Sequence, residues 1–256
     1  MTFLDEVLAT KRAEIERLRL DPPRVTPFVG AGFGTALRGS RLSVIAEIKR
    51  RSPSKGELSP GLDAARTARD YALGRAAAIS CLTDLKFFGA RPGDFAQARA
   101  AGLPVLRKDF LVDEIQIDES VGLGASAVLL IAKILPVRRL EALLRHATAL
   151  GLDALVEVHD DDEVDLAIAA GAVIIGVNNR DLATLAVDSG RALRVRPRIP
   201  SGIVSVAESG VRTRDDVRRI EDAGFDAVLI GETLVTSPDP AATLLDLTGM
   251  SAGVSQ

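Results

Sequence analysis

An alternation of short apolar runs with longer amphipathic segments repeats along this 256-residue chain and constrains its fold more than any other feature. The apolar runs indicate strands that are buried on both faces. The expected strands are residues 43–48, 77–83, 105–107, 127–131, 154–158, 173–177, 203–207 and 227–230. The helices expected after them are residues 62–74, 92–101, 113–122, 136–150, 160–170, 188–196, 213–223 and 239–247. Eight such units at this length favour a closed (β/α)8 barrel with a parallel sheet.

An open doubly wound sheet is the alternative, but its Gly-x-Gly-x-x-Gly motif does not follow the first expected strand. A helix is expected before that strand, with Thr2 as its N-cap and Asp5 at the capping-box position. We expect irregular connection over residues 22–41, the barrel over 42–248 and a frayed tail over 249–256. The whole chain, residues 1–256, is therefore predicted to be a single α/β domain, a TIM barrel with an extra N-terminal helix.

Charge and apolar content limit the partners of the chain. The formal net charge is −3, so nothing indicates a nucleic-acid surface. No apolar run reaches the length of a membrane span, and the N-terminal segment carries acidic residues that signal and transit peptides lack. We therefore expect a cytoplasmic protein without a membrane partner. The single cysteine, Cys81, lies in an apolar run, which predicts a buried thiol and excludes an intramolecular disulfide and most thiolate metal sites.

The first expected strand turns from apolar to charged within a few residues, in the stretch IAEIKRRSPSKG at 45–56. Glu47 and Lys49 share one face of the strand because strand side chains alternate. An acid and an amine at the end of a buried strand need partners or a ligand. A structural ion pair is one interpretation of this pair, and a functional site is the other.

Polar residues follow the other strands too, and the active site of a (β/α)8 barrel lies at the C-terminal ends of its strands. The polar strand ends are Glu47 and Lys49, Thr83 and Asp84, Arg107 to Asp109, Lys133, Glu157 and His159, Asn178 to Asp181, Glu208 and Ser209, and Glu232. We therefore expect one cavity to be lined by Glu47, Lys49, Lys108, Glu157, Asn178 and Ser209. The two histidines, His146 and His159, are interpreted as surface or structural residues.

Glycine recurs after the last two strands, in Ser209-Gly210 and Gly231-Glu232. Glycine allows backbone N–H groups to approach a ligand closely. The loops after strands seven and eight form the recurring phosphate site of these barrels. The sequence therefore predicts a phosphorylated small molecule as the substrate.

Five motifs together resemble the indole-3-glycerol-phosphate synthase family of tryptophan biosynthesis. They are IAEIKRRSPS at 45–54, PVLRKDF at 104–110, LVEVH at 155–159, GVNNRDL at 176–182 and VAESG at 206–210. The similarity extends from the leading helix to Leu247, with the motifs in the order of the family. The resemblance implies closure of an indole ring on 1-(2-carboxyphenylamino)-1-deoxyribulose 5-phosphate, with loss of carbon dioxide and water and without cofactor or metal.

The resemblance also implies roles for the strand-end residues. Lys108 is the general acid at the ketone, and Lys49 binds the anionic substrate and is a second candidate donor. Glu157 is the second acid–base group, Glu47 orients the lysines and the anilino nitrogen, and Asn178 hydrogen-bonds the substrate. The substrate-binding residues implied are Ser52, Pro53, Phe87, Phe110, Arg180 and Glu208, with Phe110 on the aromatic ring and Arg180 supporting Glu157 or Asn178. The phosphate-binding residues implied are Ser209, Gly210, Gly231 and Glu232.

Some positions depart from the usual pattern of the family. Asp84 stands where Glu is common, Ala90-Arg91 stands where Gly-Ser is usual, and the segment 71–76 lacks a second glycine. These departures concern one loop and its preceding helix, so they affect the fit of the substrate rather than the catalytic set. A specialised copy that serves a secondary pathway remains open. We expect a monomer that could associate with other tryptophan-pathway enzymes.

Three other functions are weighed against this one. A phosphoribosylanthranilate isomerase would need a Cys and Asp acid–base pair, whereas strand one lacks the Cys and strand six ends in Asn178. A Schiff-base aldolase would use a strand-end lysine such as Lys108 as its nucleophile. An inactive barrel that only binds a phosphorylated ligand would not require the full set of acids and bases.

Overall fold

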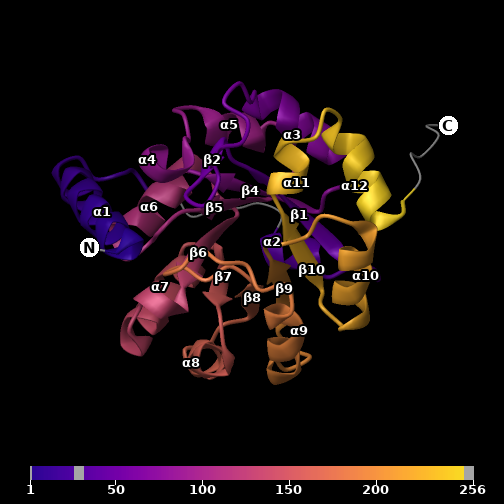
Figure 1. Cartoon of the computed structure of the whole chain (residues 1–256). Helices are drawn as coiled ribbons and strands as arrows, with labels where there is room; N and C mark the ends of the chain where they lie inside the picture. The colour runs from indigo at the N-terminus through magenta and orange to yellow at the C-terminus, as the bar shows by residue number, and fades with distance from the viewer. Residues whose placement is uncertain (1, 26–31, 251–256) are drawn as a thin grey trace.

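The computed structural model describes residues 2–25 and 32–250, and it shows a closed barrel of parallel strands surrounded by helices (Figure 1). The barrel strands are β1 (Ser43–Ile48), β4 (Ala78–Leu82), β5 (Val105–Lys108), β6 (Ala127–Ile131), β7 (Asp153–Val158), β8 (Ile174–Asn178), β9 (Val204–Glu208) and β10 (Ala227–Ile230). Each strand pairs in parallel with its neighbour in this series, and β10 closes the barrel against β1. The predicted (β/α)8 fold is confirmed.

Helices connect these strands around the outside of the barrel, and their ends lie within three residues of the expected positions. They are α3 (Ala64–Leu73), α5 (Asp94–Arg99), α6 (Glu114–Leu123), α7 (Val137–Ala149), α8 (Asp161–Ala169), α9 (Arg191–Val195), α10 (Arg214–Asp222) and α12 (Pro240–Thr248). The expected leading helix is α1 (Phe3–Leu20), and the predicted capping box between Thr2 and Asp5 is present.

Several short elements were not expected from the sequence. The segment predicted to be irregular contains α2 (Phe33–Leu37), so that prediction was wrong there. The charged stretch after β1 does not simply end the strand but forms a small antiparallel hairpin of β2 (Arg51–Ser52) and β3 (Gly56–Glu57). The remaining short elements are α4 (Leu85–Phe88), α11 (Glu232–Val235) and the 3-10 turns η1 (Ala132–Ile134) and η2 (Arg196–Arg198).

The side chains of each strand alternate between two hydrophobic clusters, as the period of two requires. In β1, Ile45 points into the barrel, where it joins the interior cluster with Leu106 of β5 and Leu155 of β7. Its neighbours Val44 and Ala46 belong to the larger cluster between the strands and the helices. Cys81 of β4 lies in this outer cluster and is fully buried, as predicted.

The two N-terminal helices are joined to the barrel at specific points. In α2, Phe33 and Leu37 join the interior cluster, and the backbone N–H of Gly34 donates to Asp153, the first residue of β7, over 2.8 Å. This contact places α2 at the N-terminal ends of the strands. Helix α1 lies beside α6 and α4 (Figure 1).

Parts of two expected segments, residues 26–31 of the irregular connection and 251–256 of the frayed tail, lie outside the described residues. Among the residues that are described, no helix combines the length and the apolar character needed to cross a membrane.

Candidate active site

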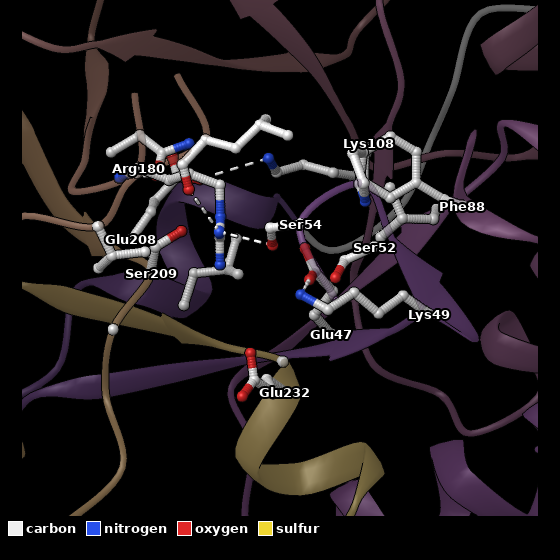
Figure 2. A pocket seen from close by; sticks show the side chains of 18 of the residues that line it. Glu47, Lys49, Ser52, Ser54, Phe88, Lys108, Arg180, Glu208, Ser209 and Glu232 are labelled. Carbon is white, nitrogen blue, oxygen red and sulfur yellow. Dashed lines mark hydrogen bonds and ion pairs between the residues drawn. The ribbon is translucent and has the colours of Figure 1, made fainter. Parts of the chain in front are cut away.

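A cavity of about 340 Å³ opens at the C-terminal ends of the strands (Figure 2). The register of the barrel brings the polar strand ends to one level there, because Leu82 pairs with Lys108, Ile131 with Glu157, and Asn178 with Glu208. The six residues expected to share one cavity all line it, namely Glu47, Lys49, Lys108, Glu157, Asn178 and Ser209. The cavity also includes Ser52, Pro53, Phe110, Arg180, Glu208, Gly210, Gly231 and Glu232.

Lys108, the last residue of β5, lies between two buried carboxyl groups. Its Nζ is 3.1 Å from Oε2 of Glu157 and 3.4 Å from Oε2 of Glu208. Burial alone would lower the pKa of this ammonium, but the charges of Glu157, Glu208 and Glu47 together raise the pKa above its ordinary value. Lys108 is therefore a fixed positive charge and hydrogen-bond donor at neutral pH.

Glu47 and Lys49 form a close pair at the end of β1 (Figure 2). Lys49 Nζ is 2.5 Å from Oε1 of Glu47, and the hydroxyl of Ser80 donates to Oε2 over 3.4 Å. Burial would raise the pKa of Glu47, but the ammonium groups of Lys49 and Lys108 hold it below its ordinary value. Glu47 is thus an ionised carboxylate between the two lysines, a position from which it can orient both.

Glu208, at the end of β9, is the most unusual acid of the site. Burial, together with the negative charges of Glu157 and Glu47, outweighs the attraction of Lys108 and raises the pKa of Glu208 to about 8. Its Oε1 is buried without a hydrogen-bond partner, and a Cβ placed on Gly176 would lie 2.2 Å from that oxygen. Only glycine at position 176 leaves room for this side chain.

Asn178 and Arg180 are linked through the backbone rather than through their side chains. The amide oxygen of Asn178 accepts a 2.9 Å hydrogen bond from the backbone N–H of Arg180. The Arg180 guanidinium instead donates to Ser54 Oγ over 2.8 Å and to the carbonyl of Leu185 over 3.0 Å. The Arg180 side chain is therefore bonded to the β2–β3 hairpin region and to Leu185 rather than to Glu157 or Asn178, and only its backbone N–H contacts Asn178.

Phe88 of α4 lines the cavity, whereas Phe87, which was expected to bind the substrate, does not. Phe87 is turned away from the cavity and packs edge-on against Phe3, with ring centroids 5.3 Å apart. Phe88 lines the cavity instead and lies 6.3 Å from the ring of Phe110. Successive helical residues point about 100° apart, so only one of the two can face the mouth, and the sequence could not tell which.

The predicted phosphate corner combines left-handed backbone with nearby cations. Ser209 and Gly210 have φ angles of +66° and +88°, a conformation that favours glycine. A Cβ on Gly231 would lie 2.5 Å from Oε1 of Glu47, so a larger residue here would displace the Glu47–Lys49 pair. The Glu232 carboxylate pairs with Lys55, and its negative charge disfavours phosphate, which leaves only its backbone for that role.

Besides Phe88, the residues of the cavity that were missed from the sequence include two cations and a further aromatic side chain. Phe3 reaches it from α1, Lys55 from the hairpin, and Arg212 from the loop after β9. Arg212 follows Gly210 by two residues, which was a usable signal, whereas nothing in the sequence placed α1 at the mouth. Within residues 2–25 and 32–250, no group of three or more His, Cys, Asp and Glu side chains could hold a metal ion.

Together, the barrel and its mouth define a class of protein, a (β/α)8 enzyme with paired ammonium and carboxyl groups suited to acid–base chemistry on an anionic substrate. A sequence model of the family described as indole-3-glycerol phosphate synthase matches residues 4–247. The chain belongs to the indole-3-glycerol phosphate synthase family.

Two relatives from different bacteria illustrate the likeness. A protein of Syntrophobacter fumaroxidans named indole-3-glycerol phosphate synthase is 45% identical over an alignment of 261 positions, gaps included, which covers 98% of each chain. A Streptomyces coelicolor protein named indole-3-glycerol phosphate synthase 2 is 52% identical over 218 aligned residues, covering 85% of this chain and 84% of that protein.

Solved structures with little sequence identity share the fold. An N-acetylmannosamine-6-phosphate 2-epimerase from Clostridium perfringens superposes with a TM-score of 0.62 at 15% identity, covering 88% of this chain and 99% of that one. A thiamine phosphate pyrophosphorylase from Pyrococcus furiosus gives a TM-score of 0.59 at 17% identity, covering 82% and 95%. At such identity these likenesses concern the barrel alone.

Proposed function

We propose that this chain is a carboxy-lyase that converts 1-(2-carboxyphenylamino)-1-deoxy-D-ribulose 5-phosphate into indole-3-glycerol phosphate, carbon dioxide and water. The observation that supports this most directly is the Lys108 ammonium between Glu157 and Glu208, at the base of a mouth that also contains Phe88 and Phe110. This arrangement offers a proton donor, acid–base carboxyl groups and an aromatic surface in one cavity.

In the proposed ring closure, the substrate's ring carbon that bears the carboxylate attacks the ketone carbon, and negative charge develops on the ketone oxygen. Lys108 stabilises that oxygen and then protonates it. The raised pKa makes Lys108 a weak acid towards a neutral ketone. The alkoxide that forms in the transition state is a stronger base than an amine, so transfer at that stage is favourable.

The remaining charges of the cavity suit the later steps. Lys49, held by Glu47 at 2.5 Å, would bind the substrate carboxylate until carbon dioxide leaves and the electron pair of the broken bond returns to the ring. The new hydroxyl then departs as water with a proton from an acid, and a base removes the last ring proton to form the indole. Glu157 is the group we assign to these transfers, because its carboxyl group contacts the Lys108 ammonium at the mouth of the barrel.

The phosphate group of the substrate would bind at the loops after β9 and β10. Ser209, Gly210 and Gly231 would offer backbone N–H groups there. Lys55 and Arg212 border the same cavity and would add positive charge. A Schiff-base aldolase is disfavoured at this site, because the raised pKa of Lys108 keeps its amine protonated and therefore non-nucleophilic.

The proposal is tested by mixing the purified protein with the carboxyphenylamino deoxyribulose phosphate and following indole fluorescence without added metal or nucleotide. Lys108→Ala should lower kcat by roughly two to four orders of magnitude, the usual contribution of a positioned acid. Lys108→Arg should not restore the rate, because guanidinium keeps its charge but hardly releases a proton. Lys86→Ala is the matched control, since Lys86 is an exposed lysine of α4 paired with Glu6.

Two results would contradict this assignment. If the wild-type protein forms no indole product, the proposed reaction is wrong. Near-normal turnover by Lys108→Arg would show that Lys108 supplies only a positive charge. The proton donor would then be Lys49 or a carboxyl group.

A further inference from the structure

Two buried polar atoms without hydrogen-bond partners face each other behind the proposed acid–base site. They are Oε1 of Glu157 and Nε2 of His159, which lie 3.7 Å apart. Both side chains are almost fully buried, with 1% and 3% of their surface exposed. A buried polar atom without a hydrogen-bond partner costs free energy. Two such atoms side by side therefore indicate that the two groups can interact with each other.

The opposite edge of the imidazole ring is fixed by α8. Oε2 of Glu163 accepts the backbone N–H of His159 over 2.8 Å and lies 3.0 Å from Nδ1 of the ring. Because this oxygen already acts as an acceptor and an ionised carboxylate can only accept, Nδ1 must carry a hydrogen. The hydrogen-bond network therefore assigns the tautomer, and Nε2 is left to face Glu157.

The contact between Nε2 and Glu157 then needs a proton. A neutral ring protonated on Nδ1 presents a lone pair at Nε2, and an ionised Glu157 presents lone pairs at Oε1. Two acceptors that face each other in a buried pocket repel. One proton shared between them removes the repulsion, whether it lies on the imidazole or on the carboxyl group.

We propose that His159 is a positioning residue that shares one proton with Glu157 and holds this carboxyl group in place beside Lys108. The proposal rests on the acid–base role assigned to Glu157 above. The array runs from Glu163 through His159 and Glu157 to Lys108. The present 3.7 Å separation exceeds a hydrogen bond, and we expect it to shorten when substrate binds, as catalytic contacts commonly do.

The array also explains how Glu157 can accept a proton from the substrate. Before the transfer, the Glu157–His159 pair holds one proton. Afterwards it holds two, one on a Glu157 oxygen and one on Nε2, and the ring becomes an imidazolium. The carboxylate of Glu163, bonded to the far edge of the ring, balances that positive charge.

Several charged groups act on Glu157, and His159 is one of them. Burial raises the pKa of Glu157, whereas Lys108, His159 and the amide group of Asn178 lower it below its ordinary value. Glu208 and Glu47 are the other acids whose charges interact with Glu157 across the cavity. Lys133, on the neighbouring η1 turn, is paired with Asp181 instead.

The test compares two replacements of His159 with a matched control. Asn reproduces the Nδ1 edge of the ring and removes the donor towards Glu157, whereas Gln places an amide N–H near the position of Nε2. His159→Asn should lower kcat about tenfold with KM changed by about twofold or less, and His159→Gln should stay within about threefold of wild type. The control is His146→Asn, because His146 pairs with Asp118 on the outer helices and should have no effect.

Two further measurements separate positioning from a purely structural role. The low-pH limb of kcat/KM should move to higher pH in both His159 variants but not in His146→Asn, because the pKa of Glu157 rises when the imidazole is removed. In a double-mutant cycle, His159→Asn should add almost nothing to the effect of Glu157→Gln, since the first acts through the second.

The proposal is overturned if His159→Asn keeps the wild-type kcat and pH profile, if Gln is as slow as Asn, or if the cycle is additive. If the Asn variant does not fold, His159→Gln decides alone, and an unmoved low-pH limb overturns the proposal. A failure of the proposed reaction is recognised separately, by the absence of indole product from wild type. In that case a carbon-13 NMR titration of the Glu157 carboxyl group still tests the pair, since its pKa must be higher in His159→Asn.

Discussion

Lys11 of α1 is an ammonium group with almost no solvent contact, and replacing it by methionine should strongly destabilise the protein. Its side chain is 1% exposed, and Nζ lies 2.7 Å from Asp84, 2.8 Å from Asp109 and 2.9 Å from Glu14. Asp84 follows β4, and Asp109 follows β5 directly after Lys108. One buried lysine therefore joins the N-terminal helix to two loops of the mouth.

The magnitude follows from what Lys11→Met leaves behind. Removing one partner of a buried ion pair typically costs about 3–5 kcal/mol, because the other charge stays buried and uncompensated. Asp109 keeps the Arg107 guanidinium at 3.4 Å and the hydroxyl of Thr83, so the lower end, about 3 kcal/mol, is expected. At this chain length that corresponds to a fall in Tm of about 6 °C.

The pH dependence adds a second, independent check. Burial raises the pKa of Asp109, but Arg107 and Lys11 lower it below its ordinary value. An acid whose pKa is lower in the folded than in the unfolded protein stabilises the fold at pH values above its unfolded-state pKa, about 3.9 for Asp. This stabilisation is lost as the pH falls through the pKa of the folded state. The difference in unfolding free energy between wild type and Lys11→Met should therefore be full at pH 7 and shrink below about pH 4.

Urea unfolding at several pH values measures both effects. The matched control is Lys86→Met, which removes an exposed pair with Glu6 between α4 and α1 and should cost about 1 kcal/mol or less. A loss for Lys11→Met as small as that of the control, or one that does not change with pH, would refute the reasoning.

Three further predictions concern the mouth. Gly210→Val should raise KM far more than it lowers kcat, because a side chain at φ +88° strains the loop and approaches Val187. The control is Gly171→Val, which has a similar φ of +91° but lies in open space and should leave KM unchanged. Inorganic phosphate should compete with substrate in the wild type, and an unchanged KM in the Gly210 variant would place the phosphate elsewhere. The pKa of Glu208 is raised to about 8 in the folded protein, so the wild type loses stability as the pH rises and this buried acid ionises. Glu208→Gln cannot ionise, so its stability relative to wild type should increase from about pH 5 to about pH 9. A difference in thermal stability that is constant across this range would contradict the raised pKa.

The barrel and most of its site could be predicted because they depend on local patterns. Each strand is a short apolar run followed by polar residues, and the parallel register then brings the strand ends together whatever the loops do. Glu47, Lys108 and Glu157 could therefore be placed in one cavity without any knowledge of their contacts. The family motifs lie on these same strand ends, which is why the resemblance and the fold agree.

The short elements could not be predicted, because they have little stability of their own. Helices α2, α4 and α11 have five residues or fewer, well below the length at which an isolated helix forms, so tertiary contacts must hold them. The orientation of α4 then decides that Phe88 rather than Phe87 faces the cavity.

The sequence by itself determined the barrel, the end of the barrel at which the site lies and the residues that approach it. The tertiary structure alone decided which charges meet there. Lys11 lies on the apolar stripe of α1 between Val7 and Ile15, and only the packing of that helix against the mouth supplies Asp84 and Asp109 as its partners. In the same way, His159 faces Glu157 because β7 and α8 fix its ring between two carboxyl groups. Hydrophobic periodicity is a property of the local sequence, whereas the distance between two charges depends on how distant segments pack.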